Sequence, residues 1–202
     1  MTREDFIGRI RGALHREPGD PLEAPPALLE PLTEWDTAAL VELFTTELEA
    51  VGGHVYLVES LSEARAQLKN ILTEMGAESF ICTTDPIVDE VLSAVTLLLN
   101  DNPAAADVGV SGARCAIANT GTLVLTSEMG RKASLLPMNH VALLRAEQIV
   151  PSMAEALETY LDDLPSAWVQ ATGPSRTADI ELTLTTGVHG PGVAHVVLIR
   201  GV

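Results

Sequence analysis

Strand-like and helix-like segments alternate through the first half of this chain, and this alternation constrains the fold most. Helical spacing of apolar residues predicts helices over residues 34–51, with Thr33 as the cap, and 61–74, and short apolar runs predict strands at 54–58 and 79–83. Asp85-Pro86 opens a third helix that is expected to run to about Leu99. Repetition of this kind is typical of a mostly parallel sheet that is covered by helices on both faces.

The pattern changes after Asp107. Three strand-like runs, Val108–Val110, Cys115–Ala118 and Thr122–Thr126, follow one another with no helix between them, so hairpin or antiparallel pairing is expected there. Further strands are predicted at 141–145, 168–172 and 194–199, the last one central in the sheet, and a helix at 152–161. The stretch 177–186 fits a strand or a helix, and its capping residues and Gly187 favour a short helix that starts at Ser175 or Thr177. The fold class is α/β, with mixed strands added to a mostly parallel sheet.

We interpret the N-terminal segment as an appendage to the α/β domain. Residues 2–15 can form an amphipathic helix with Phe6, Ile7, Ile10 and Leu14 on one face, and five prolines follow between Pro18 and Pro31. We therefore divide the chain into a helix with a Pro-rich tether (1–31) and an α/β domain (32–202). Packing on its own domain, on a twin subunit or on a partner protein all remain open for this helix.

Charge and cysteine usage exclude several functions. The 12 basic and 28 acidic residues give a net charge of −16, which repels nucleic acid and anionic lipid. No apolar run is long enough to span a bilayer and the N-terminus lacks an apolar signal core, so a cytoplasmic location is expected. Cys82 and Cys115 each lie in an apolar run without a CxxC spacing, which predicts buried thiols and no iron–sulfur or zinc site within this chain.

Two loops carry cations against this acidic background. Gly173 to Thr177 reads GPSRT between a strand end and a predicted helix start, so backbone N–H groups, the Ser175 and Thr177 hydroxyls and the Arg176 guanidinium could form an anion cradle. Arg131 and Ser134 lie in a second loop that contains a local cluster of basic residues. Together the loops favour a carboxylate or phosphate ligand. A capped turn and a polar hairpin loop are the structural alternatives.

The histidines suggest hydrogen bonding or acid–base work more than metal binding. His140 and His189 fall on loops beside the candidate site, whereas His195 lies inside a strand and is expected to be a core or edge residue. Asp179 and Glu181 could supply oxygen ligands, but no short metal-ligand spacing such as HExxH is present. The sequence likewise lacks a GxSxG elbow, a GxGxxG fingerprint and a Walker motif.

Two long stretches carry a family resemblance. NTGTLVLTSEMGRKASLLPMNHVALL, followed by VPS, and TGPSRTADIELTLTTGVHGPGVAHVVLI resemble the LUD (lactate-utilisation) domain family, and are most similar to its small C-type subunit without iron–sulfur motifs. The resemblance implies a three-layer fold like that of ribose-5-phosphate isomerase and CoA transferases. It also implies a three-component system that oxidises lactate to pyruvate, with the iron–sulfur clusters in the two partner subunits and no cofactor in this one.

The chain departs from the family pattern at two places. Family members commonly read Gly-Ala-Asp and Glu-Thr-Gly where this chain has Gly112-Ala113-Arg114 and Asn119-Thr120-Gly121. By analogy with CoA transferases, the family's glutamate would be the acyl acceptor or general base. Asn119 can form hydrogen bonds but cannot take either role, so acyl transfer by this chain is not expected.

These observations give one leading expectation and two alternatives. The leading one is an accessory subunit of an iron–sulfur lactate-oxidising system that binds a small organic anion or phosphate. The expected contacts are Asn119, Thr120, Gly121, Arg131, Ser134, Gly173, Ser175, Arg176, Thr177, Asp179 and Glu181, with His140 and His189 as catalytic candidates. The alternatives are a stand-alone enzyme for a phosphosugar or acyl-CoA, and a non-catalytic sensor of a small organic acid. Catalysis by this chain alone and homo-oligomerisation stay open.

Overall fold

The computed structural model describes residues 2–13, 15, 35–93, 95, 98–177 and 185–201. The chain divides into two compact units, Met1–Pro31 and Leu32–Val202, and each is described by itself. In the first unit the predicted helix is present as α1 (Arg3–Ala13), with Phe6 and Ile10 on its exposed surface. The proline-rich residues 16–34 and Leu14 lie outside the described part of the chain.

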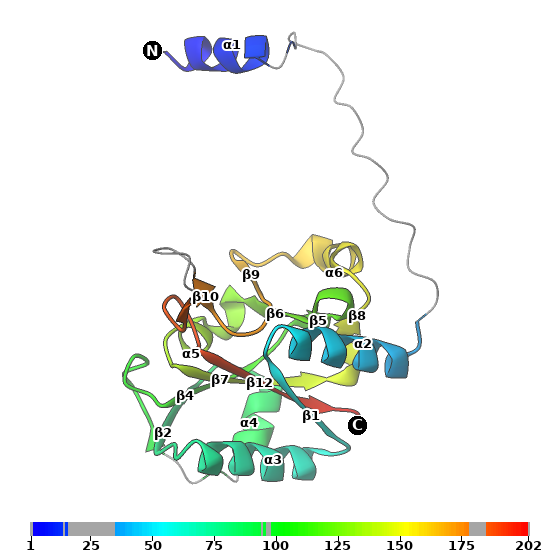
Figure 1. Ribbon diagram of the computed structural model, residues 1–202, viewed down its shortest axis with the longest axis vertical. Coiled ribbons are helices and arrows are strands. Elements are labelled where there is room, and N and C mark those ends of the chain that lie inside the picture. Colours follow the sequence, from blue (N-terminus) through cyan, green and yellow to red (C-terminus); the bar gives the residue numbers. More distant parts are fainter. Residues whose placement is uncertain are drawn as a thin grey trace. The chain divides into compact units, whose positions relative to one another are not determined.

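A six-stranded sheet forms the centre of the second unit (Figure 1). Its order is β1-β12-β7-β4-β2-β3, and every neighbouring pair is parallel. The strands are β1 (His54–Val58), β2 (Ser79–Cys82), β3 (Leu98–Leu99), β4 (Val108–Gly112), β7 (Asn139–Arg145) and β12 (Val193–Ile199). As predicted, the last strand is internal: β12 lies between β1 and β7, and Ala194–Ile199 is buried along its whole length.

Helices cover both faces of this sheet (Figure 1). On one face α3 (Leu61–Glu74) and α4 (Pro86–Leu92) bury Leu68 and Val88 against Val141 and Val197. On the other face α2 (Thr37–Ala50) packs Phe44 and Leu48 against alternate residues of β7 and β12. The result is the predicted three-layer α/β arrangement with a mostly parallel sheet.

A second sheet of four strands packs beside α2 in the same apolar core. Its order is β8-β5-β6-β9, and the β5–β6 and β6–β9 pairs are antiparallel. The strands are β5 (Cys115–Ile117), β6 (Thr122–Thr126), β8 (Ile149–Val150) and β9 (Trp168–Ala171), and α6 (Met153–Tyr160) covers their outer face. These are the mixed strands expected after Asp107, although the first run, β4, joins the large parallel sheet.

Short elements complete this unit. They are the 3-10 turns η1 (Ala118–Thr120), η2 (Ser127–Met129), η3 (Ala146–Gln148) and η4 (Leu161–Asp163), the one-turn helix α5 (Lys132–Leu135), and the strand pair β10 (Arg176–Thr177) and β11 (Thr185–Thr186). Gly109 of β4 has the backbone of α5 directly against it: a Cβ added there would lie 2.7 Å from the Ala133 carbonyl carbon. The missing side chain therefore allows α5 to lie on the sheet.

Two predicted helix boundaries are wrong. The N-cap of α2 is Asp36, whose carboxylate accepts a 2.7 Å hydrogen bond from the Ala39 N–H, so Thr33 does not hold this position. The helix that opens at Pro86 ends at Leu92 and does not reach Leu99. Leu98 and Leu99 instead pair in parallel with β2, because hydrogen bonding at this sheet edge replaces the helical bonds that they would otherwise make.

The helix expected over 177–186 is also contradicted where the structure describes it. Arg176 and Thr177 pair antiparallel with Thr186 and Thr185, so no helix starts at Ser175 or Thr177. Residues 178–184, including Asp179 and Glu181, lie outside the described residues. The described ends of this segment are thus two short strands, while the residues that carry the alternating apolar pattern, Ile180, Leu182 and Leu184, lie outside the described residues. Among the described helices, none has the length and apolar character needed to cross a membrane.

Candidate functional site

The two segments that carry the predicted site lie side by side. The Met138 carbonyl accepts hydrogen bonds from the N–H groups of Gly192 (2.8 Å) and Val193 (3.2 Å). The Thr122 and Thr172 hydroxyls are 2.7 Å apart, and β6 pairs with β9 immediately before Gly173. Residues some 50 positions apart in the chain thus form one surface near the amino ends of β7 and β12.

A cavity of about 30 Å³ lies between these segments. Ser134 and His140 line it from the first segment and Gly173 and Pro191 from the second, and the remaining wall is apolar. The structure therefore brings three predicted site residues, Ser134, His140 and Gly173, to the same cavity. Its volume suits about two water molecules, which is too little for an organic acid.

His140 was predicted to lie on a loop but is the second residue of β7, and it is a buried polar group at this cavity. Its Nε2 lies 2.8 Å from the Ser111 hydroxyl of the neighbouring strand β4, and both side chains are buried. Burial and the nearby His195 lower the pKa of His140 from 6.5 to about 4. The imidazole is thus neutral at neutral pH, so it can exchange hydrogen bonds but supplies no positive charge to an anion.

Ser111 was missed by the sequence prediction. It is the fourth residue of the buried strand VGVSG, and a hydroxyl buried in that position needs a hydrogen-bond partner. The sequence therefore contained a signal for Ser111, but not for the identity of its partner, which is 29 positions away.

The side chains of Arg176 and Arg131 have different surroundings in the structure. The Arg176 guanidinium donates a hydrogen bond to the Val51 carbonyl at the C-terminal end of α2. Arg131 precedes α5, is exposed, and has no side-chain partner among the described residues, while its carbonyl accepts a 3.2 Å bond from the Ser134 hydroxyl. No described contact joins the two guanidinium groups, so their convergence on one anion stays a prediction. A guanidinium has five N–H donors, so Arg176 retains donors for a ligand.

The GPSRT loop differs from the predicted helix start. The Ser175 N–H donates to the Pro191 carbonyl (2.8 Å), and the Ser175 carbonyl accepts from the Gly187 N–H (3.0 Å). These bonds lead into the β10–β11 pair and occupy a backbone donor that the anion cradle required. Three side-chain groups of the predicted cradle remain: the hydroxyls of Ser175 and Thr177 and the guanidinium of Arg176.

The Asn119–Gly121 turn packs against α2. Gly121 has a φ of 60°, and a Cβ on it would lie 2.6 Å from the Leu48 Cα, so this position requires glycine for both reasons. Asn119 is exposed and has no positive φ, and its N–H donates to the Pro151 carbonyl (3.1 Å). The left-handed conformation that asparagine would tolerate falls on Gly121 instead. The Thr120 hydroxyl extends from this turn to within 2.7 Å of the Thr122 hydroxyl.

His189 and His195, the other two histidines considered in the sequence, lie apart from the cavity lining. His189 is exposed on the loop that follows β11. His195 is buried as predicted, its Nδ1 lies 3.2 Å from the Tyr56 hydroxyl, and its ring stacks on His54 at 4.9 Å. Burial and His54 lower the pKa of His195 to about 4. This cluster has a structural explanation in strand pairing.

The thiols and Arg114 also have structural roles. Cys115 is buried, which raises the pKa of its thiol to about 11, and Cys82 is half-buried. Within the described residues no group of three or more His, Cys, Asp or Glu side chains could hold a metal ion. Arg114, at the place where the family commonly has aspartate, forms a 2.6 Å ion pair with Asp163 and lies over the Tyr160 ring. It thus ties η4 and α6 to the second sheet.

Comparison with known proteins places this arrangement in a family. The model of the LUD domain matches residues 89–199, which is more than half of the chain. Lactate utilization protein C of Macrococcus caseolyticus is 28% identical over 94% of this chain and 92% of its own length. The protein of that name from Geobacillus sp. is 30% identical over 72% of this chain and 73% of its own length.

Some matches cover less. Lactate utilization protein C of Oceanobacillus iheyensis is 40% identical over 43% of this chain, and that match spans only 40% of the relative's length. A crystal structure of a DUF162 family protein from Deinococcus radiodurans has a TM-score of 0.64 at 20% identity, covering 82% of this chain and 99% of that one, which shows a shared fold. The family match over both site segments and the shared fold lead to one conclusion: the chain belongs to the LUD domain family.

Proposed function

We propose that this chain is a component of a lactate-utilisation system and works beside iron–sulfur subunits that carry the redox chemistry. The observation that carries the proposal is the similarity to proteins named Lactate utilization protein C along nearly the whole chain. The family match includes both segments that meet at the His140 cavity. Lactate oxidation to pyruvate releases two electrons, which need an acceptor. The two cysteines of this chain are a buried and a half-buried free thiol. Partner subunits with clusters would supply the electron acceptor.

The role assigned to this chain is binding of a small organic anion without turnover. The open surface beside Arg176 is the favoured place, because the 30 Å³ cavity is too small and the buried His140 is neutral. Arg176 is exposed at the start of β10, next to the half-buried Ser175 and Thr177 with their hydroxyls, and its charge opposes a net charge of −16. Arg131 would add a second cation if a ligand draws the loops together.

Ligand-dependent melting tests this binding role. L-lactate at about one hundred times its dissociation constant should stabilise the wild-type protein by about 2.7 kcal/mol, because it binds the folded state alone. The Arg176→Ala variant should lose most of that gain. Each variant is compared with and without lactate, so the lost hydrogen bond to Val51 cancels.

Arg200→Ala is the matched control for this measurement. Arg200 is an exposed arginine paired with Glu59, beyond the carboxyl end of β12 and so at the opposite end of that strand from the site. Its removal should leave the lactate-dependent gain unchanged. A gain that persists in Arg176→Ala, or that falls equally in both variants, would remove Arg176 from the anion site.

A further inference from the structure

Three exposed leucines form a stripe on the helix that covers the second sheet. α6 continues directly into η4, and Leu157, Leu161 and Leu164 are 40%, 64% and 50% exposed. Leu157 and Leu161 are four residues apart and share a helical face, and Leu164 follows one turn later. A different face of α6, with Ala156 and Tyr160, packs on the sheet. The leucine stripe is therefore left outside the core.

Carboxylates border the leucine stripe. Residues 153–164 include four acidic side chains and no basic one. Glu158 and Asp162 each follow one of the leucines and are exposed. Asp163 is paired with Arg114, whereas Glu158 and Asp162 have no ion-pair partner among the described residues. This surface is thus apolar with an acidic border.

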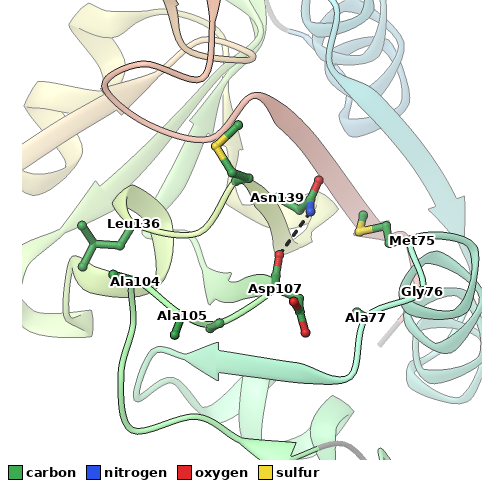
Figure 2. A pocket seen from close by; sticks show the side chains of 10 residues that line it. Met75, Gly76, Ala77, Ala104, Ala105, Asp107, Leu136 and Asn139 are labelled. Carbon is green, nitrogen blue, oxygen red and sulfur yellow. Dashed lines mark hydrogen bonds between the residues drawn. The ribbon is translucent and has the colours of Figure 1, made fainter.

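Other exposed apolar side chains of the α/β unit have more polar surroundings. Leu136 lies at a cleft of about 340 Å³ whose wall also contains Asp107 and Asn139 (Figure 2). That wall presents more polar than apolar surface. The leucine stripe is therefore the better surface for burial against another protein segment.

α1 presents a complementary surface. Phe6, Ile10 and Ala13 have the same four- and three-residue spacing as the leucines, and no residue of α1 is buried. Arg3 lies one turn before Phe6 and Arg11 follows Ile10, so both exposed arginines border the apolar face. α1 contains three arginines and two acidic residues, in a chain with a net charge of −16. It can thus approach an acidic surface without meeting an excess of like charge.

A second copy of the chain can cover both surfaces at once. A helix of 11 residues is marginal in water, because packing of its apolar face supplies most of its stability. Within one chain the apolar face of α1 and the leucine stripe are both exposed. Each copy has one of each, so two copies that exchange α1 make the same contact twice and close a two-fold dimer. Residues 14–36 link α1 to α2, and a link of that length spans at most about 75 Å.

We propose that two copies of this chain associate by exchanging α1, so that α1 of each copy docks on the leucine stripe of the other. Phe6 and Ile10 pack against the leucines, and the arginines of α1 lie beside Glu158 and Asp162. The apolar contact supplies most of the affinity, and the opposite charges orient the helix. The inference does not depend on the proposed lactate function.

Sedimentation equilibrium of the whole chain, residues 1–202, tests the exchange. The mass of the wild-type protein should rise from 21.4 kDa toward twice that value as its concentration increases. Phe6→Glu and Leu161→Glu should each weaken dimerisation about tenfold or more, because each places a charge in the apolar contact. Leu98→Glu makes the same replacement at a leucine of β3 that is 75% exposed, and it should dimerise like the wild type.

Mixing the two variants distinguishes exchange between copies from docking within one chain. Phe6→Glu retains an intact leucine stripe and Leu161→Glu retains an intact α1, so a mixture can form one of the two contacts. The mixture should therefore associate more strongly than either variant alone. Leu157→Glu replaces Leu161→Glu in both measurements if the latter does not fold.

Charge reversal tests the orientation of the helix separately. Replacing Arg3 and Arg11 with glutamate should weaken the dimer, and adding Glu158→Arg and Asp162→Arg should restore it, because opposite charges again face each other. A wild-type chain that stays monomeric, an equal loss in Leu98→Glu and Leu161→Glu, a mixture no stronger than its components, or a charge reversal without recovery would each overturn the proposal.

Discussion

Replacing Gly109 with alanine should destabilise the α/β unit by about 3 kcal/mol or more. The new methyl group would stand 2.7 Å from the Ala133 carbonyl carbon and 3.2 Å from its Cα, against backbone that cannot rotate away. Gly109 has no positive φ, so this cost comes from overlap alone. Relief requires α5 to lift from β4, which would also displace Ser134 from the His140 cavity. Urea unfolding of the wild type and the variant measures the difference.

Gly8→Ala is the matched control for Gly109→Ala. It adds the same methyl group in α1, where a Cβ would meet no atom within 4 Å. The unfolding of the α/β unit should therefore be unchanged in this variant. A loss below about 1 kcal/mol in Gly109→Ala would contradict the close approach of α5 to β4.

Acidification should destabilise the folded protein well before its ordinary carboxylates titrate. The pKa of His140 is 6.5 in a free histidine and about 4 in the folded state, so the unfolded state binds more protons between these values. Stability is then fully present above pH 6.5 and is lost as the pH falls toward 4. The shift corresponds to about 3 kcal/mol from His140. His195, whose pKa is lowered in the same direction, adds to the loss.

Two histidine variants identify the source of this pH dependence. His140→Asn can keep a hydrogen bond to Ser111 without a titrating ring, so its free energy of unfolding should change less between pH 7 and pH 4. His189→Asn replaces an exposed histidine and should retain the wild-type profile. The carboxylate of Asp107, with a pKa below 3.8, contributes its own loss only at lower pH. An unchanged profile in His140→Asn would show that His140 is not buried as a neutral group.

Much of the fold could be predicted from local patterns in the sequence. The bounds of β1 and α3 agree with the prediction residue for residue, because an apolar run or a helical stripe ends there at a glycine or a capping residue. Gly76 in particular ends α3 with a φ of 65°. The parallel sheet followed from the alternation of such elements.

The errors arose where sheet pairing competes with local preference. Leu98 and Leu99 continue the apolar pattern of α4, yet they pair with β2 as a short edge strand. Arg176 and Thr177 carry signals of a helix start, yet their partners are Thr185 and Thr186. In both cases a residue from elsewhere in the chain supplies the hydrogen bonds, and a local pattern contains no information about that residue.

The proximity of three candidate residues was predictable from the sequence, but their contacts were not. Ser134, His140 and Gly173 were named from two loops, and the structure places all three at one cavity. The Ser111 partner of His140, the Val51 partner of Arg176 and the cleft around Asp107 each join residues that are far apart in sequence. Periodicity and motif spacing do not encode such distances.

Growth of a deletion strain tests the central claim most directly. In the source organism, loss of the gene for this chain should abolish growth on L-lactate as the sole carbon source. Growth on pyruvate should be normal, because the missing step precedes pyruvate. The wild-type gene should restore growth on lactate. Equal growth of the deletion strain and its parent on lactate would contradict the assignment of this chain to lactate utilisation.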